Sequence, residues 1–296
     1  MTLPDVSFVI GTFNSEEFIE GCLNSIYNQD YSGNVEVIVV DNSSEDETRE
    51  IIRKKFPEVK LIVLPNSQYG ASEMYNIGFS SAHGEYIAKL DDDSEISSDW
   101  CNKLVQKFWR ESEDLGIIQT KIKEKNQTLY DTEEYIDKFK ACGVMIKKST
   151  LDEIGFFDEN FFIQREDFEL GHRFVLNGYK ILVWPETETI HKTENLPGNS
   201  TSNFKMRLNT RNQLWIIWKY YDRKNAIIST FYRISRNLLF SLKNRTISGW
   251  FLGVFGALKK FPKYAVRERT PCKDLNYRRW TLREILSSVK NVQKHF

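Results

Sequence analysis

Short runs of strand-forming residues alternate with stretches of helical periodicity through the first third of the chain. Four apolar runs each end in polar residues, at 6–10, 35–40, 59–64 and 85–90. Between them, apolar side chains recur at helical spacing in residues 16–28, in residues 45–56 and around Met74, Ile77 and Phe79. This alternation predicts an α/β protein with a Rossmann-like, doubly wound and mostly parallel sheet that has helices on both faces. In such a sheet, ligands bind at the carboxyl ends of the strands.

The pattern continues less regularly through the middle of the chain and then becomes helical. Strands are predicted at 116–120, 141–148 and 178–185, and helices at 100–113 and from Glu166 onward, whereas residues 121–140 show no clear period. Three further helices are predicted at 205–221, 225–242 and 247–261. We therefore expect a catalytic domain over residues 1–204, with halves at 1–96 and 97–204, and a helical region over 205–296.

Length and composition are those of an ordinary globular protein. The chain has 296 residues, of which 41% are hydrophobic, and no run approaches the roughly 18 apolar residues of a membrane span. The N-terminus lacks the basic and apolar regions of a signal peptide, so we expect none. The four cysteines form no Cys-x-x-Cys pair, which is typical of reduced, structural cysteines in a cytoplasmic protein.

The net charge of zero conceals two halves of opposite sign. Residues 1–204 carry 20 Lys and Arg against 37 Asp and Glu, and residues 205–296 carry 21 against 4. An anionic partner of the basic half could be a lipid surface, a nucleic acid or the acidic half itself. Core packing alone would explain the apolar stripe of residues 250–261, but an interfacial helix explains both stripe and charge. We therefore predict a cytoplasmic protein bound peripherally to the inner face of an anionic membrane, without a nucleic-acid partner.

Three consecutive aspartates, Asp91, Asp92 and Asp93, follow the apolar run 85–90 directly. Carboxylates this close repel one another unless a cation lies between them, and oxygen ligands suit a hard divalent ion shared with a diphosphate. The alternative is a solvated acidic turn that precedes the helix beginning near Ser97 to Asp99. The sequence therefore predicts either a metal site or a capping turn here.

Other polar residues stand at the ends of the first three predicted strands. They are Thr12 and Asn14 after the first, Asp41 and Ser43 after the second, and Asn66 and then Asn76 after the third. Turn chemistry alone would also place Asn, Asp and Ser there. Neither a Gly-x-Gly-x-x-Gly nor a P-loop motif is present. If phosphates bind at this edge, we expect a metal ion to hold them.

A second group of acids, Glu166 and Asp167, lies where a helix is predicted to begin, just after an aromatic cluster. Carboxylates in a first helical turn often only stabilise the helix, by interacting with the positive end of its dipole. Alternatively, an aromatic wall can adjust the basicity of Asp167 for use as a general base. His191 follows the predicted strand near 178–190, where a lone histidine is more often an ordinary packed or surface side chain.

Four motifs, at residues 9–14, 39–44, 75–78 and 90–93, resemble the nucleotide-sugar-binding half of family 2 glycosyltransferases of GT-A fold. The resemblance extends over about residues 6–218 and implies an inverting enzyme that uses a nucleoside diphosphate sugar. Among its branches, the galactofuranosyl and rhamnosyl types are closest in motif. Tyr75 is a departure, because many relatives have an arginine there. If that arginine neutralises diphosphate in relatives, the metal or a C-terminal arginine must do so here.

The resemblance also implies roles for individual residues. Asp93 and His191, with Asp91, would hold Mn²⁺ or Mg²⁺, and Asp167 of the Glu166–Asp167 pair would be the general base. The side chains that would contact the nucleotide sugar are Thr12, Asn14, Asp41, Ser43, Asn76, Asp91, Asp92 and Arg211. Residues 196–203, which are rich in Pro, Gly, Ser and Asn, would form a lid over the donor.

The predicted function is metal-dependent transfer of a sugar from a UDP- or dTDP-sugar to a hydroxyl of a lipid-linked or cell-surface glycan. One alternative is a sugar-1-phosphate nucleotidyltransferase, although such an enzyme should have a Gly-rich loop with Arg and Lys after the first strand. A second alternative is a calcium-binding adaptor without catalytic activity, whose basic tail would bind membrane or nucleic acid.

Overall fold

The computed structural model describes residues 3–192 and 202–271 and divides the chain into two compact units, residues 1–196 and 197–296. Each unit is treated separately below. The predicted boundary at residue 204 stays a prediction, and the predicted lid lies almost entirely outside the described residues.

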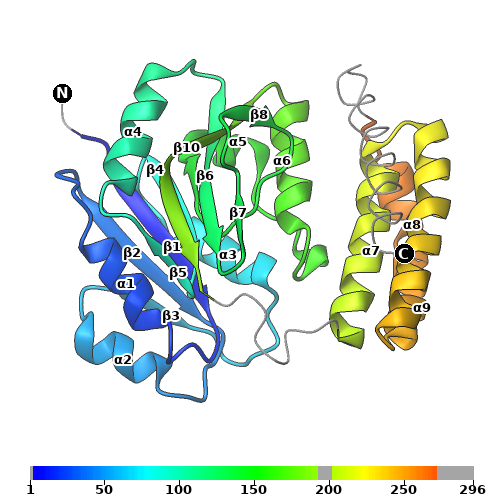
Figure 1. Cartoon of the computed structure of the whole chain (residues 1–296), viewed down its shortest axis with the longest axis horizontal. Helices are drawn as coiled ribbons and strands as arrows, with labels where there is room; N and C mark the ends of the chain where they lie inside the picture. The colour runs from blue at the N-terminus through cyan, green and yellow to red at the C-terminus, as the bar shows by residue number, and fades with distance from the viewer. Residues whose placement is uncertain (1–2, 193–201, 272–296) are drawn as a thin grey trace. The chain divides into compact units, whose positions relative to one another are not determined.

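The first half of the sheet is parallel, as the alternation of strands and helices predicts. The strands β1 (Val6–Thr12), β2 (Val35–Asp41), β3 (Lys60–Val63) and β4 (Tyr86–Asp91) run side by side in the order β3-β2-β1-β4 (Figure 1). Their carboxyl ends therefore lie at one edge, which brings the polar residues that follow β1, β2 and β4 to the same side of the molecule.

The second half of the sheet is mixed. Beyond β4 the order continues β9-β6-β10-β5, in which β10 (Lys180–His191) is parallel to β6 (Leu115–Glu124). By contrast, β9 (Val144–Lys147) and β5 (Ser94–Ile96) are antiparallel to their neighbours. The periodless stretch 121–140 contains two short strands, β7 (Gln127–Leu129) and β8 (Glu134–Ile136). These three-residue strands and β5 were too short to be predicted from alternation.

Helices cover both faces of the sheet, which confirms the predicted doubly wound α/β fold. One core contains side chains of α1 (Ile19–Tyr27), α2 (Thr48–Lys55) and α4 (Trp100–Arg110). The opposite core contains side chains of α3 (Ala71–Ser80), α5 (Lys148–Ile154) and α6 (Glu166–Leu176). Successive side chains of β1 point to opposite faces of the sheet, so that Phe8 and Ile10 pack in the first core and Val9 packs in the second.

The second unit consists of α7 (Asn203–Tyr220), α8 (Arg223–Lys243) and α9 (Ile247–Lys259), followed by a short π-helical segment, Lys263–Arg267. The helix α7 is the most buried, and its Trp215 packs with Tyr264 at 4.8 Å between ring centroids. Among the described residues, no helix is both long and apolar enough to cross a membrane.

Small residues bring α9 close to α7. A Cβ on Gly249 or Gly253 would collide with the backbone of α7 at Asn203 or Arg207. The predicted stripe on this helix is consequently divided: Trp250 and Val254 are half-buried, whereas Phe251, Phe255, Leu258 and Phe261 are exposed.

Candidate functional site

Strand pairing brings the predicted metal ligands together. After the three aspartates, β5 turns back and pairs with the end of β10, so that Ser94 lies opposite His191, and the Lys192 N–H donates to the Asp93 carbonyl at 2.9 Å. The His191 Nε2 is 3.4 Å from Asp93 Oδ1 and 4.0 Å from Asp91 Oδ2. Residues almost one hundred positions apart in sequence thereby form one cluster of two carboxylates and an imidazole.

The protonation states of this cluster suit a divalent cation. Burial lowers the pKa of His191, which keeps the imidazole neutral and its nitrogen lone pair available. Burial, together with Asp91, raises the pKa of Asp93 to about 7, and burial also raises that of Asp92 to about 6. A cation would relieve the cost of ionising these acids, and carboxylate oxygens with one imidazole are an acceptable donor set for Mn²⁺ or Mg²⁺.

Glu124 lies on the far side of the imidazole and was not predicted from the sequence. Its carboxylate, which is 5% exposed, has Oε1 at 3.7 Å from His191 Nδ1 and also forms an ion pair with Lys140. A carboxylate at this position favours the tautomer that carries its proton on Nδ1 and leaves Nε2 facing the aspartates. The end of β6 gave no pattern from which this role could be inferred.

Lys89 is a second residue that the sequence analysis missed. Although it lies within the apolar strand β4 and is only 3% exposed, its Nζ is 2.6 Å from Asp91 Oδ1. The ammonium lies 3.8 Å from the centroid of the Tyr75 ring, and the Tyr75 hydroxyl donates to the same Asp91 oxygen at 2.9 Å. Burial alone would raise the pKa of Asp91, but Lys89 outweighs it and holds that pKa below its ordinary value. Fixed positive charge is therefore present next to Tyr75.

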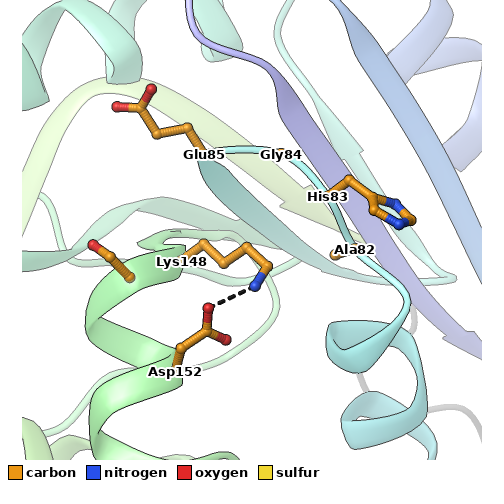
Figure 2. Close-up of a pocket in the computed structure, with 7 residues that line it drawn as sticks. Ala82, His83, Gly84, Glu85, Lys148 and Asp152 are labelled. Carbon is orange, nitrogen blue, oxygen red and sulfur yellow. Dashed lines mark hydrogen bonds and ion pairs between the residues drawn. The ribbon is translucent and has the colours of Figure 1, made fainter.

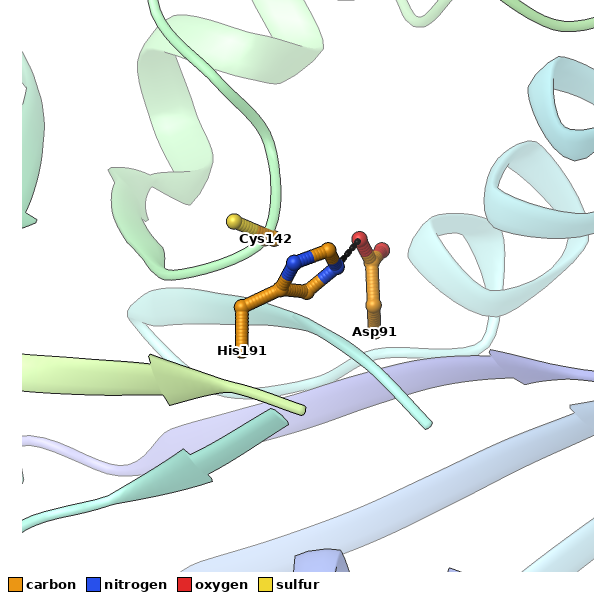
Figure 3. Close-up of side chains that lie close together, drawn as sticks. All are labelled: Asp91, Cys142 and His191. Carbon is orange, nitrogen blue, oxygen red and sulfur yellow. Dashed lines mark ion pairs between the residues drawn. The ribbon is translucent and has the colours of Figure 1, made fainter. Parts of the chain in front are cut away.

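The loop before β9 brings Cys142 to the cluster of Asp91 and His191 (Figure 3). The Cys142 sulfur, a carboxylate oxygen of Asp91 and a ring nitrogen of His191 lie within 4.8 Å of one another. The next residue, Gly143, packs so closely on β10 that a Cβ would collide with the Thr189 side chain. Glycine at this position allows the loop to approach the strand end that carries His191.

The two acids at the start of α6 have different environments. The Asp167 carboxylate accepts the N–H of Phe168 at 2.8 Å and a further backbone hydrogen bond from Ala141, the neighbour of Cys142. Among the described residues, Glu166 Oε2 is buried without a hydrogen-bond partner. Burial raises the pKa of both acids, and Asp167 raises that of Glu166 further. A shared proton therefore resides on Glu166 and leaves Asp167 ionised.

A strained loop precedes this pair. Phe162, Gln164 and Arg165 all have positive φ, at 68°, 71° and 68°, a region that side chains other than glycine rarely adopt. The Ser72 N–H at the start of α3 donates to the Phe162 carbonyl at 3.0 Å, and Gly70 lies so close to Phe162 that a Cβ would collide with its backbone. The strain is held by packing on α3, and it fixes the direction in which α6 begins.

Side chains predicted to contact the donor mostly stabilise the loops at the strand ends. The Thr12 hydroxyl donates to Asp92 at 2.8 Å, and buried Asp41 accepts the Ser44 N–H at 3.1 Å. Asn14 and Ser43, both at positive φ, bond the Glu45 N–H and the Leu64 carbonyl, respectively. These residues lie at the predicted edge, and their contacts with a donor stay a prediction.

Asn76 and Arg211 are engaged elsewhere in the structure. The Asn76 side chain accepts from the Phe157 N–H and donates to the Phe157 carbonyl, both at 3.0 Å, which ties α3 to the loop before α6. Arg211 lies on α7 in the second unit, where its guanidinium is 4.4 Å from the centroid of the Trp215 ring. Their roles toward a nucleotide sugar also stay predictions.

A separate surface pocket lies at the opposite end of β4. It is lined by residues 82–85 and by Lys148, Ser149 and Asp152, with Lys148 and Asp152 paired at 2.6 Å (Figure 2). Because residues 82–85 precede β4 whereas Asp91 ends it, this pocket is remote from the acidic cluster. The polar groups of the described chain converge at the carboxyl edge of the sheet instead.

Comparison with known proteins identifies the class. The profile described as "Glycosyl transferase family 2" matches residues 7–170, which is more than half of the chain. A solved structure of S. aureus TarS 1-349 in complex with UDP-GlcNAc has a TM-score of 0.65 at 18% identity, with 90% of this chain and 84% of that chain covered. A structure of GalNAc-T7 with UDP, GalNAc and Mn²⁺ has a TM-score of 0.63 at 15% identity, with 88% and 58% covered.

Curated relatives match mainly over the first part of the chain. A GalNAc(5)-diNAcBac-PP-undecaprenol beta-1,3-glucosyltransferase of Campylobacter jejuni is 33% identical over 108 residues, 36% of this chain and 35% of the relative. A dolichyl N-acetyl-alpha-D-glucosaminyl phosphate 3-beta-D-2,3-diacetamido-2,3-dideoxy-beta-D-glucuronosyltransferase of Methanococcus voltae is 23% identical over 215 residues, 64% of this chain and 67% of the relative. The chain thus aligns with about a third of the length of the first curated relatives.

These findings define a glycosyltransferase fold of the GT-A class. The chain belongs to glycosyl transferase family 2. The family and the fold inferred from the four motifs are thereby confirmed.

Proposed function

We propose that this protein is a metal-dependent, inverting glycosyltransferase that moves a sugar from a UDP- or dTDP-sugar to a hydroxyl of a lipid-linked or cell-surface glycan. The observation that carries the proposal is that the acids after β4 and the acids at the start of α6 lie near one another at one edge of the sheet. The cluster of Asp91, Asp93 and His191 adjoins Cys142, whose neighbour Ala141 binds the base candidate Asp167.

Each group has a distinct part in the proposed reaction. A divalent ion held by Asp91, Asp93 and His191 would stabilise the negative charge of the departing diphosphate. Asp167, ionised because Glu166 holds the proton of the pair, would accept the proton of the acceptor hydroxyl as that oxygen attacks the anomeric carbon. Glu124 would hold His191 in the required tautomer, and Lys89 would hold Asp91 ionised. Attack on the face opposite the leaving group would invert the anomeric configuration.

Family membership favours sugar transfer over nucleotidyl transfer and over a calcium-binding adaptor. The donor class is supported by TarS and GalNAc-T7, whose structures contain UDP-GlcNAc and UDP, and the metal by the Mn²⁺ in the latter. A lipid-linked acceptor is supported by the name of the Campylobacter relative, whose substrate is a diphosphate-linked undecaprenol.

We also propose that the second unit binds an anionic membrane. Its helices expose apolar side chains at helical spacing, among them Phe231 and Leu239 on α8, at 69% and 63%, and Phe251 on α9, at 63%. Residues 203–271 carry fifteen Lys and Arg against two acidic residues. Apolar groups that insert and cations that attract anionic headgroups are the two properties of an interfacial helix. Such binding would place the site at the surface where lipid-linked acceptors lie.

The experiment that tests the proposed reaction is a screen of nucleoside diphosphate sugars with and without Mn²⁺ or Mg²⁺. We expect one donor to release its nucleoside diphosphate only with the metal, and faster when polyprenyl-linked glycan is present. Release of nucleotide from no donor, or release of pyrophosphate from a nucleoside triphosphate and a sugar phosphate, would contradict the proposal.

A further inference from the structure

Cys142 provides the metal cluster with a donor atom that the proposed reaction does not use. Its sulfur comes from the loop before β9, whereas Asp91 ends β4 and His191 ends β10, and the three donor atoms lie within 4.8 Å of one another (Figure 3). Hard ions such as Mg²⁺ and Mn²⁺ prefer oxygen and bind thiolate weakly. A sulfur, a nitrogen and an oxygen together form a set typical of zinc.

The state of each group is compatible with such an ion. Burial lowers the pKa of His191 and keeps it neutral, and its Nδ1 faces the Glu124 carboxylate at 3.7 Å while its Nε2 faces Asp91. Asp91 is ionised, with Oδ1 occupied by Lys89 and Tyr75 and Oδ2 directed toward the imidazole. Cys142 is 1% exposed, and burial raises the pKa of its thiol, so that the bound ion must also offset the cost of removing the thiol proton.

We infer that the site has a second coordination mode, in which Cys142, His191 and Asp91 bind a thiophilic divalent ion such as Zn²⁺. On binding, the S–H bond is replaced by a sulfur–metal bond and the thiol proton leaves to solvent, so no electron transfer is required. Zinc bonds of about 2.0 to 2.3 Å place tetrahedral donors about 3.5 Å apart, so the side chains must close by roughly 1 Å. The ion can enter past Asp91, whose side chain is 34% exposed.

This mode has a consequence for catalysis, and that part rests on the proposed function. Because Asp91 and His191 would serve both ions, a thiophilic ion displaces Mn²⁺ or Mg²⁺ and draws Asp91 toward the sulfur. We expect Zn²⁺ to inhibit transfer competitively with the activating metal and to inhibit a Cys142→Ser variant much less.

The test uses Co²⁺, whose bond to thiolate gives a near-ultraviolet charge-transfer band, on the metal-free full chain. We expect the band in the wild type, its loss on adding Zn²⁺, and its absence in Cys142→Ser and Cys142→Ala. Cys101→Ser is the matched control, because Cys101 is an equally buried cysteine of α4 that faces the core and should leave the band intact. Titration calorimetry should show Zn²⁺ affinity at least about tenfold weaker in Cys142→Ser with Mg²⁺ affinity unchanged.

Circular dichroism before titration shows whether Cys142→Ser and Cys142→Ala are folded. Loss of the band in a folded variant is therefore a loss of metal binding. A wild type without the band, or a band that survives in both Cys142 variants, overturns the inference. A protein that transfers sugar but shows no Co²⁺–thiolate band would refute only this inference. A Cys142-dependent band in a protein that transfers no sugar would refute only the proposed function.

Discussion

Lys89 is a buried cation that acts on four acids of the site. Its charge lowers the pKa of Asp91, Asp93, Glu166 and Asp167, against the burial that raises it in each. Only in Asp91, which Lys89 contacts directly, does the cation prevail. Lys89 therefore supplies fixed positive charge beside Tyr75.

Lys89→Met keeps the length of the side chain and removes its charge. We expect a loss of about 2 kcal/mol in the free energy of unfolding, less than the 3 to 5 typical of a fully buried pair because Asp91 is partly exposed. The folded pKa of Asp91 is lowered, so the pair stabilises above the ordinary pKa near 4 and this stabilisation disappears as pH falls through the folded value. Denaturant unfolding at pH 7 and pH 3 should show a smaller loss at pH 3 than at pH 7.

The matched control is Lys103→Met, because Lys103 forms an exposed pair with Asp99 at 2.8 Å and should change stability by less than about 1 kcal/mol. Equal losses in the two variants, or a Lys89→Met loss as large at pH 3 as at pH 7, would show that the charge of Lys89 has no special role.

The environment of Asp167 also predicts how the rate depends on pH. Burial raises the pKa of this carboxyl, and a general base works only when ionised. We therefore expect kcat/KM to fall as pH decreases, with an acid limb well above the ordinary aspartate pKa of about 4. In Lys89→Met this limb should move to higher pH, because the variant lacks a cation that lowers the pKa of Asp167. Rates measured between pH 5 and 9 test both statements, and a flat profile down to pH 5 would argue against them.

At the residue scale, the sequence revealed the acids and the histidine but not the residues that support them. Asp91 and Asp93 follow a predicted strand, so the topology of an α/β sheet was enough to place them at its carboxyl edge. The roles of Asp167 and His191 came from the resemblance to family 2 glycosyltransferases. Lys89 and Glu124 could not be found in this way. Lys89 lies within the apolar run of β4 and pairs with Asp91 of the same strand, and Glu124 ends β6 and contacts His191 of β10.

At the scale of elements, the segment before α6 is held by close packing on α3. Gly70→Ala places a methyl group against the Phe162 backbone. We expect a loss of about 1 to 3 kcal/mol in stability, and a lower kcat because α6 with Asp167 shifts. Gly256→Ala is the control, because Gly256 lies in α9, its nearest neighbour is Arg211 at 3.5 Å, and alanine favours helix by about 1 kcal/mol. Full activity of a folded Gly70→Ala variant would mean that this contact does not position the base.

The parallel strands and the long helices were predictable, because each has enough residues for its period to show. The three-residue strands β5, β7 and β8 were not, and β5 is the strand that brings Asp93 next to His191. The antiparallel insertion of β9 between β4 and β6 likewise depends on pairing between distant segments, which no local pattern reveals.

At the scale of the whole molecule, the opposite charges of the two halves predict how the protein associates with lipid. We expect the full chain to co-sediment with anionic vesicles, with binding that weakens but persists in high salt because apolar insertion is not screened. Phe231→Ser with Phe251→Ser should abolish the salt-resistant part, whereas Tyr135→Ser, an exposed aromatic of the first unit, should have no effect. Equal binding to neutral and anionic vesicles at low salt would count against the proposal.

The proposed reaction depends on Asp167 as the proton acceptor, and Asp167→Asn tests this role most directly. The amide is nearly isosteric with the carboxylate, but it cannot accept a proton at neutral pH. With the donor that the screen identifies, we predict unchanged donor affinity by calorimetry and a fall in kcat on the order of 10² to 10⁴. If the charge of Asp167 only stabilised the N-terminus of α6, Asp167→Asn would lower the free energy of unfolding by about 0.3 to 1 kcal/mol and leave kcat unchanged. A folded Asp167→Asn protein that transfers sugar within a few-fold of the wild-type rate would contradict the account.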